Sequence, residues 1–272
     1  METQSTLTIL FFGDIVGKPG RRVLKRFLRQ FDDKADLIVA NVENTAHGYG
    51  ITEANLIELK EAGVKVFSGG NHTFDRKEIF GFIDKEPYLL RPANYPEGTP
   101  GRGHCLVELE SGIKVGFLNL MGRVFMEPLG SPYASADQLI PKLAEETSII
   151  FVDLHAEATA EKVSMAWYLD GRASVLVGTH THVQTADERI FPQGLAYITD
   201  VGCCGPADGV IGMDKESVFR RMIQQLPSRL DIASGPANLC GVKVVLETKT
   251  GKAISIQRIQ KRETLEESQE DA

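Results

Sequence analysis

Short apolar runs alternate along much of the chain with segments whose apolar residues return at helical spacing. Residues 7–12 and 37–42 have the length and the apolar character of buried strands. Between them, residues 21–31 place Val, Leu and Phe on one face and Arg and Lys on the other, which predicts an amphipathic helix. Strand followed by helix is the pattern of an α/β fold.

Later segments extend this pattern and add hairpins. Helices are expected at residues 52–62, 76–83, 136–146 and 159–169, with Thr52 as the N-cap and Gly63 as the C-terminal cap of the first. Hairpins are expected from residues 105–109 with 113–120, around the turn 192–194, and from 241–247 with 253–259. These elements predict either one mixed sheet or two packed sheets with helices outside.

Composition and charge narrow the class of protein. The chain has 272 residues, 42% of them hydrophobic, and a formal net charge of -7, which argues against binding to long nucleic acid. It has no apolar run near the roughly 20 residues that span a bilayer, and its four cysteines show no CxxC spacing. We therefore expect a cytoplasmic protein with no membrane partner. We expect one domain over residues 1–262 and an acidic disordered tail over 263–272.

Side chains of the kind that bind metals stand where apolar runs end. In chain order they are Asp14, Glu43, Asn44, Asn71, His155, His180 and His182. The carboxyl ends of parallel strands meet at one edge of a sheet, so these side chains are expected to converge. Their oxygen and nitrogen atoms suit transition metals. The sequence therefore predicts a metalloenzyme.

Two neighbouring ions fit this ligand set. His180 and His182 share one face of an extended chain, with Cα atoms roughly 6–7 Å apart, so each can serve a different metal. Paired ions about 3.5–4 Å apart need a bridging carboxylate, for which Glu43 is the natural candidate. Two divalent ions with Asp14 and Glu43 leave about +2 charges, which a hydroxide and a phosphodiester would neutralise. A phosphomonoester stays open as an alternative.

Two phosphate-binding motifs are absent from the first glycine-rich stretch. Its glycines lie too close together for a Walker loop, and Pro19 stands where Ser or Thr would bind magnesium. The spacing of Gly13, Gly17 and Gly20 misses the dinucleotide fingerprint. Binding of NAD is therefore not expected.

Four motifs resemble those of YmdB-like metallophosphoesterases, in order and over nearly the whole chain. They are residues 13–21 (GDIVGKPGR), 41–44 (NVEN), 69–75 (GGNHTFD) and 178–185 (GTHTHVQT). The wider calcineurin-like superfamily usually has a DxH motif and a bridging Asp. Here Ile15 and Val16 follow Asp14, and Glu43 with Asn44 stands in for that Asp, which is typical of the YmdB-like branch.

The resemblance implies a fold, a metal centre and a substrate class. The implied fold is a four-layer αββα sandwich of two mixed sheets flanked by helices. The implied cofactors are two divalent or trivalent ions, iron or manganese, and the implied state is a homo-oligomer. One ion would be held by Asp14, Glu43, Asn44 and His182, and the other by Glu43, Asn71, His155 and His180. The implied substrates are cyclic nucleotides, notably 2',3'-cyclic monophosphates, with 3',5'-cyclic monophosphates as a second candidate.

His72 is cast by the same resemblance as the general acid for the leaving ribose oxygen. An imidazole with an unperturbed pKa of about 6.5 can carry a proton close to neutral pH. A metal-bound hydroxide would then attack phosphorus in line with that oxygen. The other role open to His72 is that of a hydrogen-bond donor to the phosphate.

Further polar residues have weaker claims. His47 and His104 lie in glycine-rich stretches without a ligand pattern, so surface positions are expected. Arg91 and Asn94 are candidates for contacts with phosphate or base, and packing roles explain them equally well. For Cys203 in residues 200–213 we expect a loop beside the substrate or at an oligomer contact, rather than thiol catalysis.

The sequence thus predicts a dinuclear phosphodiesterase that opens cyclic nucleotides. Two alternatives stay open. One is a phosphomonoesterase or nucleotidase with the same metal centre. The other is a regulatory protein that binds a nucleotide with little turnover.

Overall fold

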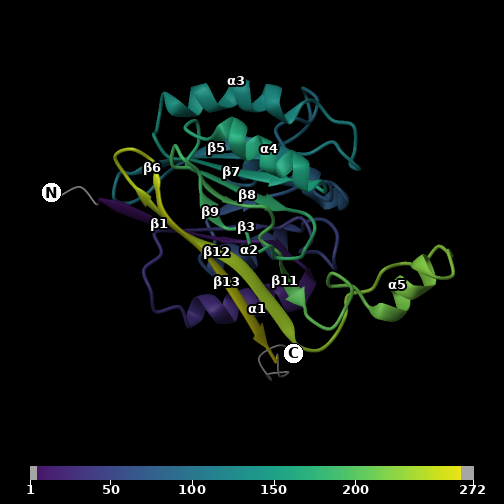
Figure 1. Ribbon diagram of the computed structural model, residues 1–272. Helices are drawn as coiled ribbons and strands as arrows, with labels where there is room; N and C mark the ends of the chain where they lie inside the picture. The colour runs from purple at the N-terminus through teal and green to yellow at the C-terminus, as the bar shows by residue number, and fades with distance from the viewer. Residues whose placement is uncertain (1–4, 265–272) are drawn as a thin grey trace.

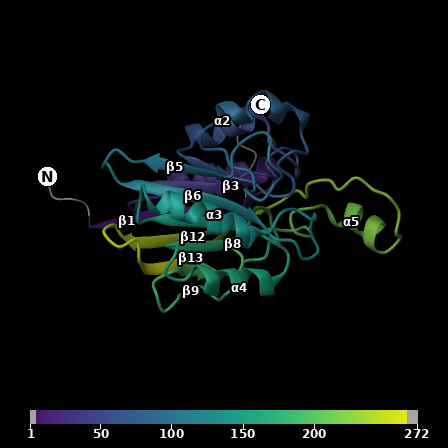
Figure 2. The ribbon, with the colours of Figure 1, turned by 90° about the horizontal axis from the view of Figure 1, so that it is seen from above.

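Two β-sheets pack face to face in the computed structural model, which describes residues 5–264 (Figures 1 and 2). In this described part the first sheet has the strand order β2-β11-β12-β1-β3-β4, with β13 beside β12. Its strands are β1 (Thr6–Phe12), β2 (Asp14–Ile15), β3 (Leu37–Asn41), β4 (Val66–Ser68), β11 (Cys203–Pro206), β12 (Ala237–Glu247) and β13 (Ala253–Glu263). The second sheet has the order β5-β6-β7-β8-β10-β9. Its strands are β5 (His104–Glu108), β6 (Lys114–Met121), β7 (Ile150–His155), β8 (Val175–Thr179), β9 (Arg189–Ile190) and β10 (Ala196–Ile198).

Helices cover the outer face of each sheet. Helices α1 (Gly17–Arg29) and α2 (Glu53–Glu61) pack on the first sheet, and α3 (Pro132–Ala144) and α4 (Thr159–Leu169) pack on the second (Figure 1). Both sheets contain parallel and antiparallel pairs. The predicted four-layer sandwich of two mixed sheets is confirmed.

The alternation of side chains along β1 explains why two sheets can pack here. Leu7, Ile9 and Phe11 point to the space between the sheets, whereas Leu10 and Phe12 pack under the helices of the first sheet. A strand whose two faces are both apolar must be covered on both sides. The second sheet provides one cover, and α1 and α2 provide the other.

Aromatic rings join the two sheets at the centre of the molecule. Phe11 of the first sheet stacks on Phe151 of the second with ring centroids 5.4 Å apart, and Phe117 lies 5.5 Å from Phe151. All three side chains are buried. This contact fixes the distance between β1 and β7, whose carboxyl ends carry two of the predicted ligands.

Most predicted elements are confirmed, and one is wrong. Thr52 caps α2 by accepting a hydrogen bond from the Asn55 N–H, and Gly63 has the positive φ of a helix C-cap. All three hairpins are present. Residues 76–83 are not an α-helix, because they form the 3₁₀ helices η1 (Lys77–Gly81) and η2 (Ile83–Lys85). The flexible backbone of Gly81 and the nearby Pro87 disfavour a longer helix.

A segment that the periodicity did not predict projects from the sandwich. Residues 207–236, here called the arm, join β11 to β12 and contain the helix α5 (Lys215–Met222). Figures 1 and 2 both show α5 apart from the four layers. A helix of eight residues with few buried side chains leaves little periodic signal in a sequence.

None of the helices in residues 5–264 combines the length and the apolar character that crossing a bilayer requires. Strand β13 ends at Glu263, the first residue of the predicted acidic tail. The tail lies outside the described residues from position 265 onward. The single domain predicted for residues 1–262 stays a prediction.

Truncation of the central ring tests the role of the contact between the sheets. We expect Phe151→Ala to lower the free energy of unfolding by about 3–5 kcal/mol, because it leaves a cavity between β1 and β7. Urea unfolding followed by circular dichroism measures this loss. The control is Phe125→Ala, which removes the same atoms from a side chain that is 90% exposed. Equal stability of the two variants would contradict this view of the core.

Candidate metal centre

The predicted ligands lie at the carboxyl ends of strands from both sheets. Asp14 follows β1, Glu43 and Asn44 follow β3, and Asn71 follows β4. From the second sheet, His155 ends β7, and His180 and His182 follow β8. Because β1, β3 and β4 are parallel, as are β7 and β8, each sheet presents its ligands at one edge.

One group of ligand atoms surrounds the Nε2 atom of His155. Asn71 Oδ1 lies 2.9 Å from this atom, Glu43 Oε1 lies 3.0 Å from it, and His180 Nδ1 lies 3.1 Å from it. The other ring nitrogen, Nδ1, lies 2.9 Å from the hydroxyl of Thr179. These four atoms are close enough together to bind a single ion. Glu43, His155 and His180 place their ligand atoms within reach of one metal ion, and Asn71 adds a fourth ligand atom.

A second group contains two buried oxygens that accept no hydrogen bond. Asp14 Oδ1 and Asn44 Oδ1 accept no hydrogen bond from any described residue. His182 Nε2 lies 3.8 Å from Asp14 Oδ1, while its Nδ1 donates to the Ile211 carbonyl at 2.9 Å. Buried polar atoms in native proteins are nearly always satisfied, so these two oxygens fit the ligands of a cation.

Burial and mutual charge shift the pKa values of this cluster. Burial raises the pKa of Asp14. Burial also opposes the charge of Glu43, but the nearby His155 outweighs this effect and lowers the pKa of Glu43. Burial would lower the pKa of His155, yet Glu43, Asp14 and Asp153 raise it to about 9. Burial and the charge of His155 lower the pKa of His180 to about 3. The low pKa keeps the His180 imidazole neutral, which is the form that binds a cation. His155 would have to release its proton to bind the same cation.

The backbone of the histidine pair is strained, and a buried ion pair holds it. His180 and His182 have backbone φ values of 101° and 64°, which residues other than glycine rarely adopt. Between them, the N–H and hydroxyl of Thr181 donate to Asp200 Oδ2 at 3.1 and 2.8 Å. The same oxygen accepts from the Lys162 ammonium at 2.7 Å, and both charged side chains are 1% exposed. Asp200 therefore fixes the turn that presents both imidazoles.

A second buried carboxylate lies behind the cluster. Asp153 accepts a hydrogen bond from the Thr179 hydroxyl at 2.8 Å, and Thr179 in turn contacts His155. The Ser68 hydroxyl also donates to Asp153. Burial raises the pKa of Asp153 to about 7. Asp153 thereby connects β7, β8 and β4 directly beneath the proposed ligands.

Gly70 shows how closely the two sheets approach one another. A Cβ atom at this position would collide with the imidazole of His155 and the carboxylate of Glu43. Only glycine therefore lets the loop after β4 approach β7 closely enough for Asn71 to meet His155.

His72 lies at the open side of the cluster. Its N–H donates to Glu43 Oε2 at 3.0 Å, and its Nδ1 lies 2.8 Å from Asp75 Oδ2. The Tyr49 ring meets the imidazole edge to face at 4.8 Å. The Asp75 carboxylate orients the ring, so Nε2 is the nitrogen available to a ligand.

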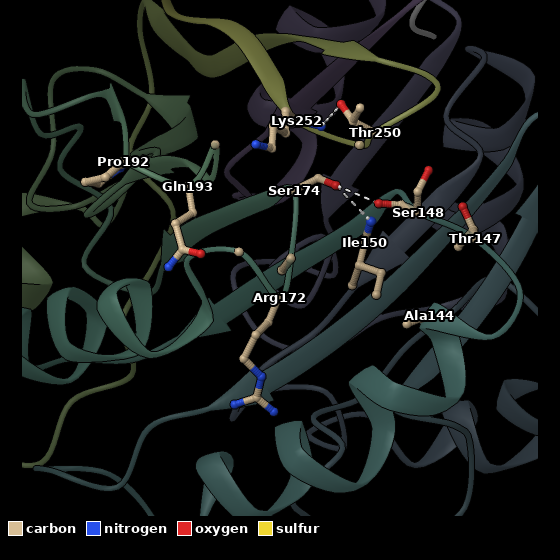
Figure 3. A pocket seen from close by; sticks show the side chains of 14 residues that line it. Ala144, Thr147, Ser148, Ile150, Arg172, Ser174, Pro192, Gln193, Thr250 and Lys252 are labelled. Carbon is tan, nitrogen blue, oxygen red and sulfur yellow. Dashed lines mark hydrogen bonds between the residues drawn. The ribbon is translucent and has the colours of Figure 1, made fainter.

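A cavity of about 550 Å³ opens directly beside the cluster. Cluster residues form one side of it, and Tyr49 and the arm form the other. A different cavity of about 440 Å³ lies where β7 and β8 begin, and its 14 lining residues include no acidic residue and no histidine (Figure 3). Its Ser174 hydroxyl is occupied by the Ile150 N–H. Of these two cavities, only the one of about 550 Å³ is lined by proposed metal ligands.

The weaker candidates have structural positions. The Arg91 guanidinium donates hydrogen bonds to the backbone carbonyls of Pro92, Thr99 and Pro100. The Asn94 amide donates to those of Met121 and Gly130. His47 is exposed, and His104 is half-buried in β5. These hydrogen bonds give Arg91 and Asn94 structural roles that need no contact with a substrate.

The stretch 200–213 differs from the predicted loop. Its residues Cys203 and Cys204 lie in β11, where they are buried. Burial raises the pKa of both thiols well above its usual value, so neither is a nucleophile at neutral pH. Val210 and Ile211 further along do line the cavity, as expected of a loop beside a substrate.

Sequence reasoning missed the residues that position the ligands. They are Asp75, Asp153, Lys162, Thr181 and Asp200. Asp75 and Thr181 stand inside the quoted motifs, and Asp153 precedes His155 by two positions in one strand. That spacing places Asp153 and His155 on the same face of β7 and was the available signal. Lys162 gave no signal, since a lysine on a helix is usually solvated.

Known proteins resemble this chain along nearly its whole length. A Bacillus subtilis (strain 168) protein named 2',3'-cyclic-nucleotide 2'-phosphodiesterase is 49% identical over 255 residues, covering 93% of this chain and 96% of the relative. The crystal structure of a novel phosphatase from Mycoplasma pneumoniae superposes with a TM-score of 0.89 at 35% identity, covering 95% of this chain and 94% of that one. A hypothetical protein from Thermus thermophilus superposes with a TM-score of 0.89 at 38% identity, covering 94% of this chain and 100% of that one.

The family profile described as YmdB-like protein matches residues 10–259. This range includes all four motifs and every predicted ligand. The chain therefore belongs to the YmdB-like protein family.

Proposed function

We propose that the protein is a dinuclear metal-dependent phosphodiesterase that hydrolyses cyclic nucleotides, with 2',3'-cyclic monophosphates as its substrates. Membership of a family with a relative named for this activity supports a phosphoric diester hydrolase. The observation that carries the proposal is the pair of buried oxygens on Asp14 and Asn44 that accept no hydrogen bond from the described residues, beside the His155 group. A homo-oligomer and a cytoplasmic location stay predictions.

The donor atoms divide into two sets that share Glu43. Asp14, Asn44 and His182 would hold one ion with Glu43, and Asn71, His155 and His180 would hold the other with Glu43. The two Glu43 oxygens face different neighbours, since Oε1 lies near His155 and Oε2 accepts from the His72 N–H. Mixed imidazole, carboxylate and amide ligands suit iron or manganese. When bound, such ions supply Lewis-acid polarisation of phosphoryl oxygens and activation of water.

His72 would protonate the leaving ribose oxygen. Its Nδ1 is engaged by Asp75, and its side chain is partly exposed to the cavity, so Nε2 can carry the proton to a bound substrate. In the other role open to His72, the same atom would donate a hydrogen bond to the phosphate.

Loss of His72 and loss of a ligand should have different effects. We expect His72→Ala to keep about two manganese ions per chain and to lose most turnover of 2',3'-cyclic AMP, because a general acid contributes about 10²–10⁴-fold. We expect Asp14→Ala and His182→Ala to lose metal as well. Metal content by mass spectrometry, measured together with activity, checks both outcomes. Full activity of His72→Ala would exclude the general-acid role.

A substrate panel separates the proposed activity from its alternatives. Purified manganese-loaded protein is given 2',3'-cyclic AMP, 3',5'-cyclic AMP, nucleoside monophosphates and an aryl phosphodiester. We expect turnover of the 2',3'-cyclic nucleotide to be fastest, with a nucleoside monophosphate as its product on chromatography. Preference for monophosphates would indicate a phosphomonoesterase. Saturable binding without product over hours would indicate a regulatory nucleotide-binding protein.

The turn held by Asp200 provides a test of ligand positioning. Thr181→Val keeps the shape of the side chain but removes its hydroxyl donor, whereas Thr181→Ser keeps the donor. We expect the valine variant to bind manganese about 10–100-fold more weakly, because groups that orient ligands affect metal affinity on this scale. The serine variant should bind like the wild type. Titration calorimetry measures the affinities, and unchanged binding by Thr181→Val would contradict the positioning role.

A further inference from the structure

The cavity beside the cluster has two chemically different halves. The polar half is formed by His72, Thr181, Glu157 and four of the proposed ligands, which are Glu43, Asn44, His180 and His182. The apolar half comes from two separate places in the chain, Tyr49 and the arm, through Val210, Ile211, Met213, Val218, Met222 and Leu230. A cavity of about 550 Å³ lies in the range of sites for small organic ligands. A phosphate alone would fill little of it.

The arm is a folded extension with a fixed base. At its base, Met213 pairs with Ile232, and the Asp214 N–H donates to the Asp231 carbonyl at 2.7 Å. Asp214 also caps α5 by accepting from the Ser217 N–H at 3.0 Å. These bonds fix the start of α5 next to the cavity, with Val218 and Met213 packed in a small buried cluster.

The end of α5 places two unlike side chains at the rim of the cavity. Met222 is 73% exposed although it lines the cavity. Arg221 is the one lysine or arginine among the described residues that line it. The guanidinium of Arg221 has no hydrogen-bond or ion-pair partner within residues 5–264. An exposed apolar surface and a free planar donor together match an aromatic ring that carries hydrogen-bond acceptors.

We propose that the apolar half of this cavity binds the nucleobase of the substrate. This inference rests on the proposed function, because it assumes that the phosphate occupies the polar half. Met222 and Tyr49 contact the base, and Arg221 donates hydrogen bonds to its acceptor atoms. Tyr49 also touches His72, so the base is bound beside the residue that meets the ribose oxygen.

The chain offers a matched control for each side chain. Ile223 follows Met222 and is equally exposed at 73%, but it does not line the cavity. Arg220 precedes Arg221 on the same helix and is exposed, and it does not line the cavity either. Each pair of alanine variants therefore removes one arginine and one large apolar side chain at or just after the end of α5, and only one pair lies at the cavity.

The test compares two cyclic phosphates, of which only one carries a base. One is 2',3'-cyclic AMP, and the other is glycerol 1,2-cyclic phosphate, which has the same five-membered phosphate ring without a nucleoside. The ratio of their kcat/KM values is measured with manganese-loaded protein. We expect kcat/KM for 2',3'-cyclic AMP, divided by kcat/KM for the glycerol compound, to fall about tenfold in Arg221→Ala and Met222→Ala. The fall should come mainly from a higher KM for 2',3'-cyclic AMP, because contacts with the base are lost. We expect the ratio to stay at the wild-type value in Arg220→Ala and Ile223→Ala.

Binding without turnover provides an independent readout. Titration calorimetry with 3'-AMP should show weaker binding to Arg221→Ala and Met222→Ala than to the two controls. Affinity for glycerol phosphate should not separate the two pairs.

The failures of the two proposals are distinguishable. A wild-type protein that hydrolyses neither cyclic phosphate would contradict the proposed function. A wild-type protein that hydrolyses both, with one ratio shared by all four variants, would overturn the nucleobase site. If Met222→Ala and Ile223→Ala both dissociate an oligomer in sedimentation and leave the ratio unchanged, the apolar surface binds a second copy, and this also overturns the proposal.

Discussion

The structure depends on a concentration of buried charge at the junction of the two sheets. Asp14 and Glu43 are buried together with the imidazole of His155, and the partly buried rings of His180 and His182 lie beside them. Asp14 Oδ1 accepts no hydrogen bond from any described residue. Uncompensated buried charge is costly, so it persists only where something opposes it. The protein opposes it partly with the pair of Glu43 and His155. Two bound cations, as we propose, would complete the compensation, and folding and metal binding would then be coupled.

The sandwich and the buried polar network bring these groups together. The ring contact between Phe11 and Phe151 fixes the spacing of β1 and β7, and Gly70 permits the final approach of the loop after β4. Asp153 joins β4, β7 and β8 behind the ligands, and Asp200 joins α4 to the turn after β8. These carboxylates make the ligand geometry a property of the whole fold rather than of one loop. The arm then adds an apolar wall on the side where a substrate would enter.

The sequence predicted the architecture and the proximity of the candidate ligands, because both leave regular signals. Alternating apolar runs predicted either one mixed sheet or two packed sheets, and the resemblance to the YmdB-like family implied the sandwich that the structure has. Ligand-type residues at the ends of several strands lie close together, as the pattern predicted. The short helix α5 left no clear period, and the 3₁₀ helices at 77–85 were predicted as one α-helix, because local bonds and contacts with distant segments determine both. Lys162 and Asp200 could not be paired, since they lie 38 positions apart and meet only in the folded core. The apolar half of the cavity likewise forms from Tyr49 and a distant arm.

The occupancy of the cluster tests the central claim most directly. Crystals of the protein saturated with manganese can be measured by anomalous diffraction at the manganese absorption edge. The account predicts two anomalous peaks about 3.5–4 Å apart, one on each side of the Glu43 carboxylate. A single peak, or none, in saturating manganese would contradict it.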